Sequence, residues 1–173
     1  ADPSIRVADN SGRLYFPESV TVRAQNFHSA IESGPLEAVV NQLKAGGVHL
    51  MLVDESRSST GERATPLMRA AFVGDVAIAQ ALLGEIDDSW PDEVRKEYLD
   101  QRTSHEFTAY MIACARGHEE IAELLKQKGC DASLVNSFGE NGAALLKANR
   151  SVDEDSTVKS LESYLAMLDE RVL

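Results

Sequence analysis

The sequence predicts an all-α protein built as a solenoid of about four stacked helix pairs, joined by short turns and preceded by a segment of different character. The main observation is an internal repeat. Residues 65–75 read TPLMRAAFVGD, and residues 108–118 read TAYMIACARGH in the same register. A second, shorter apolar segment follows each copy, at 78–83 and at 121–125. Such a repeat is typical of stacked helix pairs, because one pair cannot bury its apolar face alone.

The composition of the chain agrees with a helical stack. Hydrophobic residues make up 43% of the 173 residues but aromatic residues only 6%, so alanine and leucine fill the apolar positions. A chain of this length is expected to form one domain. The formal net charge of −11 argues against nucleic acid and anionic membranes as partners, since both are bound by basic surfaces. The acidity either serves solubility or attracts a basic protein partner.

The repeated motif resembles the ankyrin repeat, whose consensus T-P-L-H-x-A-A-x-x-G-H is followed by an amphipathic helix and G-A-D. The second copy ends with GCD at 129–131, and the pattern extends backward to FHSAIESG at 27–34 and forward to NSFGENG at 136–142. The resemblance implies a cap at 1–24, repeats at about 25–64, 65–107, 108–140 and 141–168, and a tail at 169–173. The last repeat has lost the Thr-Pro and Gly-His pairs, and we expect its second helix at 156–168.

Capping residues mark the expected ends of the first helix in each repeat. Thr65 and Thr108 can accept hydrogen bonds from the free N–H groups of a helix start, and Pro66 fits the first turn because its missing donor does no harm there. Three glycines fall where first helices should end, and we expect left-handed backbone at each of them: Gly34, Gly74 and Gly117.

Three segments depart from the repeat pattern. Within 4–24, apolar residues flank DNSG at 9–12, which predicts a turn between two short strands that cap the first helix pair; a disordered leader is the alternative. Repeat one is longer than the usual repeat of about 33 residues by an insert within 48–64, half apolar and half a polar loop. Repeat two is longer by a predicted helix over 91–101, with Trp90 either stapling its start or standing exposed as an anchor.

The resemblance implies a protein that binds partners through its turn tips and through the exposed ends of its first helices, which line a concave face. Three of the five phenylalanines fall at such positions, where large apolar side chains are candidate anchors; the alternative is that the inserts bury them. Arg69 and Glu140 are expected to join Arg116 in a polar rim. The predicted partner-binding residues are Phe72, Val73, Trp90, His105, Phe107, Arg116 and Phe138.

No pattern of residues indicates catalysis, a metal site or a cofactor. The four histidines and two cysteines have no metal-ligand spacing, and the sequence holds no phosphate-binding loop and no nucleophile motif. His118 stands at the Gly-His position of the repeat, where the resemblance implies a structural residue that bonds between loops. The acidic cluster at 153–155 is expected to serve a helix start. We therefore expect no enzyme and no small-molecule substrate.

Two functions fit these observations. The first is an adaptor or scaffold that binds another protein, and the alternative is a structural subunit whose aromatic face packs on its own copies or on another domain. The sequence has no apolar run of about 20 residues and no signal peptide. The cysteines have no apparent pairing and suit a reducing compartment, so we expect a cytoplasmic protein, with the nucleus as the alternative.

Overall fold

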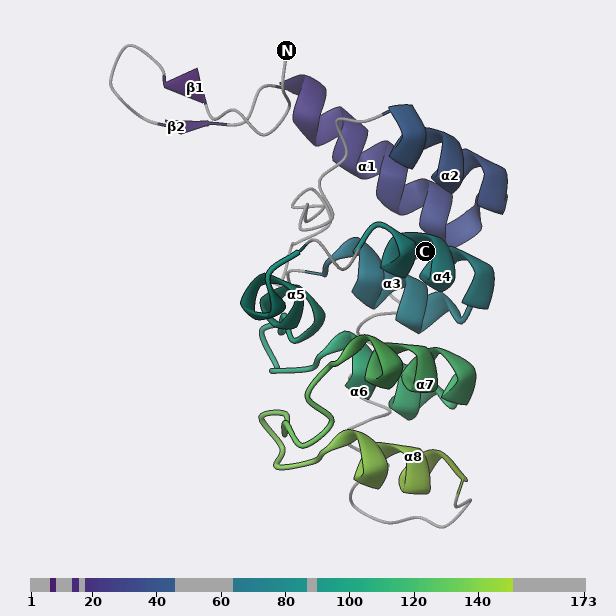
Figure 1. Ribbon diagram of the computed structural model, residues 1–173, viewed down its shortest axis with the longest axis vertical. Coiled ribbons are helices and arrows are strands. Elements are labelled where there is room, and N and C mark those ends of the chain that lie inside the picture. The colour runs from purple at the N-terminus through teal and green to yellow at the C-terminus, as the bar shows by residue number, and fades with distance from the viewer. Residues whose placement is uncertain (1–6, 9–13, 16–17, 46–63, 87–89, 151–173) are drawn as a thin grey trace.

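The fold is a stack of helix pairs, as the sequence predicts. The computed structural model describes residues 7–8, 14–15, 18–45, 64–86 and 90–150. Figure 1 shows the helices stacked along the long axis, from α1 and α2 at the top to α8 at the bottom. In these residues the elements are β1 (Val7–Ala8), β2 (Leu14–Tyr15), α1 (Glu18–Ser33), α2 (Leu36–Ala45), α3 (Pro66–Val73), α4 (Val76–Gly84), α5 (Asp92–Leu99), α6 (Ala109–Arg116), α7 (Glu119–Lys128) and α8 (Gly142–Arg150).

The core lies between successive pairs. The first helices α1, α3, α6 and α8 contact one another in that order, and the second helices α2, α4 and α7 do the same. Small residues face these contacts, which lets the backbones approach closely. The alanines that lie fully inside the core are Ala70, Ala71, Ala79, Ala113 and Ala115.

The expected caps are present at α3 and α6. The hydroxyl oxygens of Thr65 and Thr108 accept hydrogen bonds from backbone N–H groups one turn later. Gly74 and Gly117 end these helices with left-handed backbone, at φ +85° and +76°. The same expectation for Gly34 is wrong, because its φ is not in the left-handed region. Glycine is needed there for space, since a Cβ atom would lie 2.7 Å from the carbonyl oxygen of Ala30.

The N-terminal segment contains the two predicted short strands. β1 and β2 pair in antiparallel fashion, with Val7 opposite Tyr15 and Ala8 opposite Leu14. α1 then begins at Glu18, so the first helix starts inside the range that we assigned to the cap. That the strand pair covers the first helix pair stays a prediction.

The helix predicted over 91–101 is confirmed as α5. Its last turn packs into the core, and the ring of Trp90 meets the ring of Tyr98 edge to face, with 6.3 Å between centroids. The carboxylate of Asp100 accepts a hydrogen bond of 2.8 Å from the backbone N–H of Asp131. This hydrogen bond ties the end of the inserted helix to the turn that follows α7.

Several expectations concern residues outside the described ranges. They are the insert at 48–64 apart from Ala64, the acidic cluster at 153–155, the second helix of the last repeat at 156–168, and the tail at 169–173.

Candidate partner-binding surface

The turn before α8 is a tight hairpin. Val135 and Asn141 form an isolated antiparallel bridge. Inside it, the N–H of Asn136 donates to the carbonyl of Glu140 at 2.9 Å, and the N–H of Gly139 donates back to the carbonyl of Asn136 at 3.0 Å. The side-chain oxygen of Asn136 accepts two further backbone N–H groups of the same turn. The turn is therefore held from inside by its own polar groups.

The turn before α6 has the same form. The N–H of Thr103 donates to the carbonyl of Phe107 at 3.0 Å, and the N–H of Glu106 donates to the carbonyl of Thr103 at 2.9 Å. Glu106 occupies the place that Gly139 holds in the next turn, and it has a left-handed φ of +61°. A side chain in this region is strained, because its Cβ crowds the neighbouring carbonyl. This strain was not predicted from the sequence, although Glu106 aligns with the glycine of the next turn.

Replacing Glu106 by glycine should therefore raise the free energy of unfolding by about 1 kcal/mol. The left-handed backbone costs a residue with a Cβ about 1–2 kcal/mol, and the greater flexibility of glycine in the unfolded chain offsets part of the gain from relieving it. Urea unfolding of the two proteins measures the difference. Glu106→Ala is the matched control, because it removes the carboxylate and its pair with Arg102 but keeps the strain. Equal stability of the glycine and alanine variants would contradict the strain.

The two turns are joined through one carbonyl group. Both the backbone N–H and the hydroxyl of Ser137 donate to the carbonyl oxygen of His105, at 3.1 Å and 3.0 Å. As a result, the tip of one turn is held directly against the tip of the next. The side chains carried by the two tips therefore lie at fixed positions relative to each other.

Three aromatic rings meet at the joined tips, and we call His105, Phe107 and Phe138 the aromatic cluster. The rings of His105 and Phe138 are stacked, with 6.2 Å between centroids and 8° between planes. Phe107 meets Phe138 edge to face at 6.4 Å. Phe138 is 49% exposed, as predicted, whereas Phe107 is 0% exposed. The prediction that Phe107 is exposed is wrong, because the neighbouring turn covers it, and its ring instead supports Phe138 from below.

The ends of the first helices are less exposed than predicted. Phe72 is only 8% exposed, because the guanidinium carbon of Arg116 from the next repeat lies 4.2 Å above its ring centroid. Val73 and Arg116 are half-buried. The prediction that Phe72 faces solvent is wrong, and a cation over the aromatic face accounts for an apolar residue at this position. Trp90, another predicted contact residue, is half-buried against Tyr98.

The expected polar rim does not form. Arg69 points into the stack, where its Nε donates to Nδ1 of His28 at 2.7 Å and its guanidinium pairs with the carboxylate of Glu32. His28 is 0% exposed and the Glu32 side chain 7%. Glu140 is also buried. Arg69 therefore joins α1 to α3, and no short-range pattern in the sequence indicates this network.

His118 bonds between repeats, as expected. Its Nε2 lies 3.3 Å from the carbonyl oxygen of Phe72, and because a carbonyl only accepts, Nε2 carries the proton. Burial lowers the pKa of His118 below its usual value, the bond to Phe72 opposes this shift, and the nearby Arg116 adds to it. The neutral ring is thus the form that the folded protein favours.

This pKa shift predicts a pH dependence of stability. The unfolded chain binds a proton on this imidazole at higher pH than the folded chain does, so the free energy of unfolding should fall as the pH drops below about 6.5. His118→Gln keeps an N–H donor but does not titrate. Urea unfolding at about pH 7.5 and about pH 5.5 should show a larger loss for the wild type than for this variant. Equal losses in the two proteins would remove His118 as the cause.

The two cysteines have the character of structural residues. Burial raises the pKa of Cys114 to about 11 and that of Cys130 to about 12. Both thiols therefore stay protonated at neutral pH, and the thiol is a poor nucleophile compared with the thiolate.

The described part of the chain shows neither a metal site nor a membrane span. No group of three or more His, Cys, Asp or Glu there could hold a metal ion. No helix there is long and apolar enough to cross a membrane.

Comparison with known proteins supports the repeat pattern. A family model for ankyrin repeats matches three copies over residues 27–136, which is more than half of the chain. A similar protein is the NAD-capped RNA hydrolase NUDT12 of Macaca fascicularis, which is 32% identical over 80 residues. That match takes in 46% of this chain but only 15% of the relative. Given the stack of helix pairs, its turns and the family match, the chain belongs to the ankyrin repeat family.

Proposed function

We propose that this chain is a non-enzymatic adaptor or scaffold that binds another protein through the tips of its turns, with Phe138 as the main anchor. Ankyrin repeats are in general protein–protein interaction modules, and this is the family's role that we extend to the chain. The aromatic cluster is the observation that carries the proposal. We place the protein in the cytoplasm, with the nucleus as the alternative.

The physical argument rests on the half-exposed ring of Phe138. A large apolar side chain at a turn tip adds nothing to helix stacking, and its exposure to water is unfavourable. The ring is also rigid, since His105 stacks on it and Ser137 fixes the two tips together. A rigid aromatic side chain loses little conformational entropy on binding and makes a good anchor.

The remaining predicted residues take different parts in the proposal. Phe107 and Phe72 are buried and support more exposed side chains. The ring of Phe107 packs against Phe138, and the ring of Phe72 lies under the guanidinium of Arg116. Arg116, Val73 and His105 keep partial exposure and form the edge of the contact, while Trp90 contacts a partner only by its exposed part. The net charge of −11 favours a partner that is basic around its apolar contact.

The relative suggests no activity for this chain. The hydrolase named above is a protein of which the chain covers 15%, and no catalytic motif stands out in the sequence. We infer that the chain is not an enzyme and needs no cofactor or small-molecule substrate.

Phe138→Ala should weaken binding to a protein partner by about 30-fold, since the loss of an interface anchor costs about 2 kcal/mol. The partner is first captured from a lysate of the source cells by the wild type and identified by mass spectrometry. Titration calorimetry with the purified partner then gives the affinity of each variant.

The control variant is Val135→Ala, which removes another exposed apolar side chain from the same turn without touching the cluster. We expect its affinity to stay within about threefold of the wild type. Equal affinities for Phe138→Ala and the wild type would contradict the proposal. The alternative, self-association through the aromatic cluster, predicts a dimer in sedimentation experiments that Phe138→Asp converts to a monomer.

A further inference from the structure

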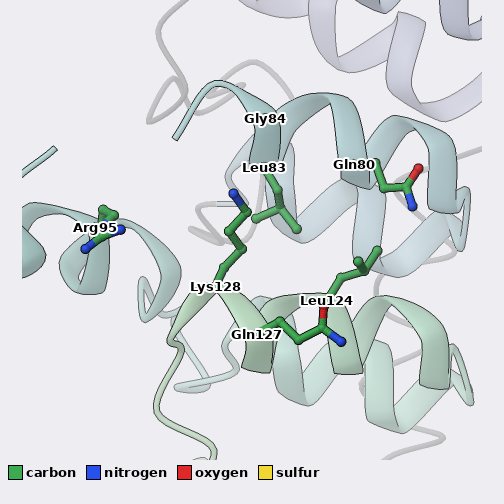
Figure 2. A pocket seen from close by; sticks show the side chains of 7 residues that line it. All are labelled: Gln80, Leu83, Gly84, Arg95, Leu124, Gln127 and Lys128. Carbon is green, nitrogen blue, oxygen red and sulfur yellow. The ribbon is translucent and has the colours of Figure 1, made fainter. Parts of the chain in front are cut away.

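A groove opens on the second helices of the stack, away from the aromatic cluster. It lies between α4 and α7, with α5 beside it, and has a volume of about 400 Å³. Figure 2 shows Leu83 descending from α4 toward α7, and Leu124 rising from α7 toward α4. We call it the basic groove, and it is lined by Gln80, Leu83, Gly84, Arg95, Leu124, Gln127 and Lys128.

The groove follows one face of each helix. The lining residues of α4 span 80–84 and those of α7 span 124–128, so each helix contributes about one turn, or about 6 Å of length. Each side supplies one leucine and one glutamine. An apolar strip flanked by amides suits a peptide, because amide side chains can donate to and accept from a peptide backbone while the leucines receive an apolar side chain.

Two cations stand at this groove in a strongly acidic protein. Arg95 comes from the inserted helix and Lys128 from the last turn of α7 (Figure 2). Within the described part of the chain Lys128 forms no ion pair. Arg95 pairs with Asp92, whose side chain is 89% exposed; exposed pairs of this kind contribute little to stability, so an incoming carboxylate can compete for the guanidinium.

We propose that the basic groove binds an acidic peptide segment of a partner protein. An apolar side chain of the segment packs on Leu83 and Leu124, and a neighbouring carboxylate lies between Arg95 and Lys128. Charge complementarity selects this occupant: the protein carries a net charge of −11, which repels acidic peptides elsewhere, while the groove presents two positive groups. A basic or neutral segment would lose these contacts.

This site is separate from the proposed anchor at the turn tips. The two share no residue, and Arg95 exists in the groove only because repeat two carries an inserted helix. An ankyrin stack without that helix would lack the guanidinium and the end of the groove that it forms.

The test uses two synthetic peptides, Ac-Glu-Leu-Glu-Leu-Glu-NH2 and Ac-Lys-Leu-Lys-Leu-Lys-NH2. Each is titrated into 15N-labelled protein, and amide shifts in two-dimensional NMR spectra locate and quantify binding. We expect the acidic peptide to shift the amides of Gly84, Leu124 and Lys128. Lys128→Glu should weaken its binding by about tenfold or more.

Lys126→Glu is the matched control, because Lys126 lies on the same helix but outside the groove, paired with Glu123. On a logarithmic scale, the loss of affinity for the acidic peptide in Lys126→Glu should be less than half of the loss in Lys128→Glu. Phe138→Ala should leave this binding unchanged, which separates the groove from the proposed anchor. Binding of the basic peptide at equal strength, equal effects of the two lysine variants, shifts outside the groove, or no binding of the acidic peptide would each overturn the proposal.

Discussion

Replacing Arg69 by methionine should lower the free energy of unfolding by about 3–5 kcal/mol, because the change leaves the carboxylate of Glu32 inside the stack without its cation. The Glu32 side chain is 7% exposed, and His28 loses the donor to its Nδ1 at the same time. The variant keeps a long apolar side chain, so the loss reports charge and hydrogen bonding more than packing. Urea unfolding followed by circular dichroism measures it.

Arg95→Met makes the same substitution in a pair whose acid is exposed, and it should cost less than about 1 kcal/mol. A triple variant, Arg69→Met with Glu32→Leu and His28→Leu, should regain most of the stability, since a buried ionic network can often be replaced by apolar residues without loss. Similar effects of Arg69→Met and Arg95→Met would contradict a buried network between α1 and α3.

Replacing Gly117 by valine should lower the free energy of unfolding by about 2–4 kcal/mol. The left-handed backbone at φ +76° costs a β-branched residue about 1–3 kcal/mol. A Cβ there would also lie 2.5 Å from Oδ1 of Asn149, and so displace the hydrogen bond from Asn149 to the carbonyl of Ala115, which is worth about 1 kcal/mol. Thermal and urea unfolding measure the change.

Two other glycines separate these causes. Gly129 is also left-handed, at φ +101°, but a Cβ there meets nothing within 4 Å, so Gly129→Val should show the strain without the displaced hydrogen bond. Gly84 lies in α4 with open space around it, and Gly84→Ala should stabilise the protein by up to about 1 kcal/mol. If Gly117→Val lowers the free energy of unfolding no more than Gly129→Val does, the hydrogen bond of Asn149 does not contribute to the effect.

The parts of the fold that local chemistry determines were predictable from the sequence. Thr65 and Thr108 cap their helices, and Gly74 and Gly117 end them, because a cap depends on residues within one turn of the chain. The inserted helix α5 carried its own start signal and apolar spacing. Gly34 differs because its glycine serves a close approach to Ala30, which looks the same in the sequence as a left-handed helix end.

The candidate site was less predictable, because exposure depends on neighbours that are distant in sequence. The repeat pattern placed Phe107 and Phe138 correctly at turn tips, but only the contact between tips decides that one ring covers the other. Phe72 was expected at the surface, yet the side chain of Arg116 lies over it. Arg69 looked like a rim residue because its partners, His28 and Glu32, lie in the preceding repeat.

Hydrogen–deuterium exchange of the protein alone and bound to its captured partner tests the central claim most directly. If the turn tips bind the partner, the amides of 103–107 and 135–141 should exchange more slowly in the complex, and the Phe138→Ala variant should lose this protection. Protection confined to the second helices α2, α4 and α7, with the turn tips exchanging as in the free protein, would contradict the claim that Phe138 anchors a partner.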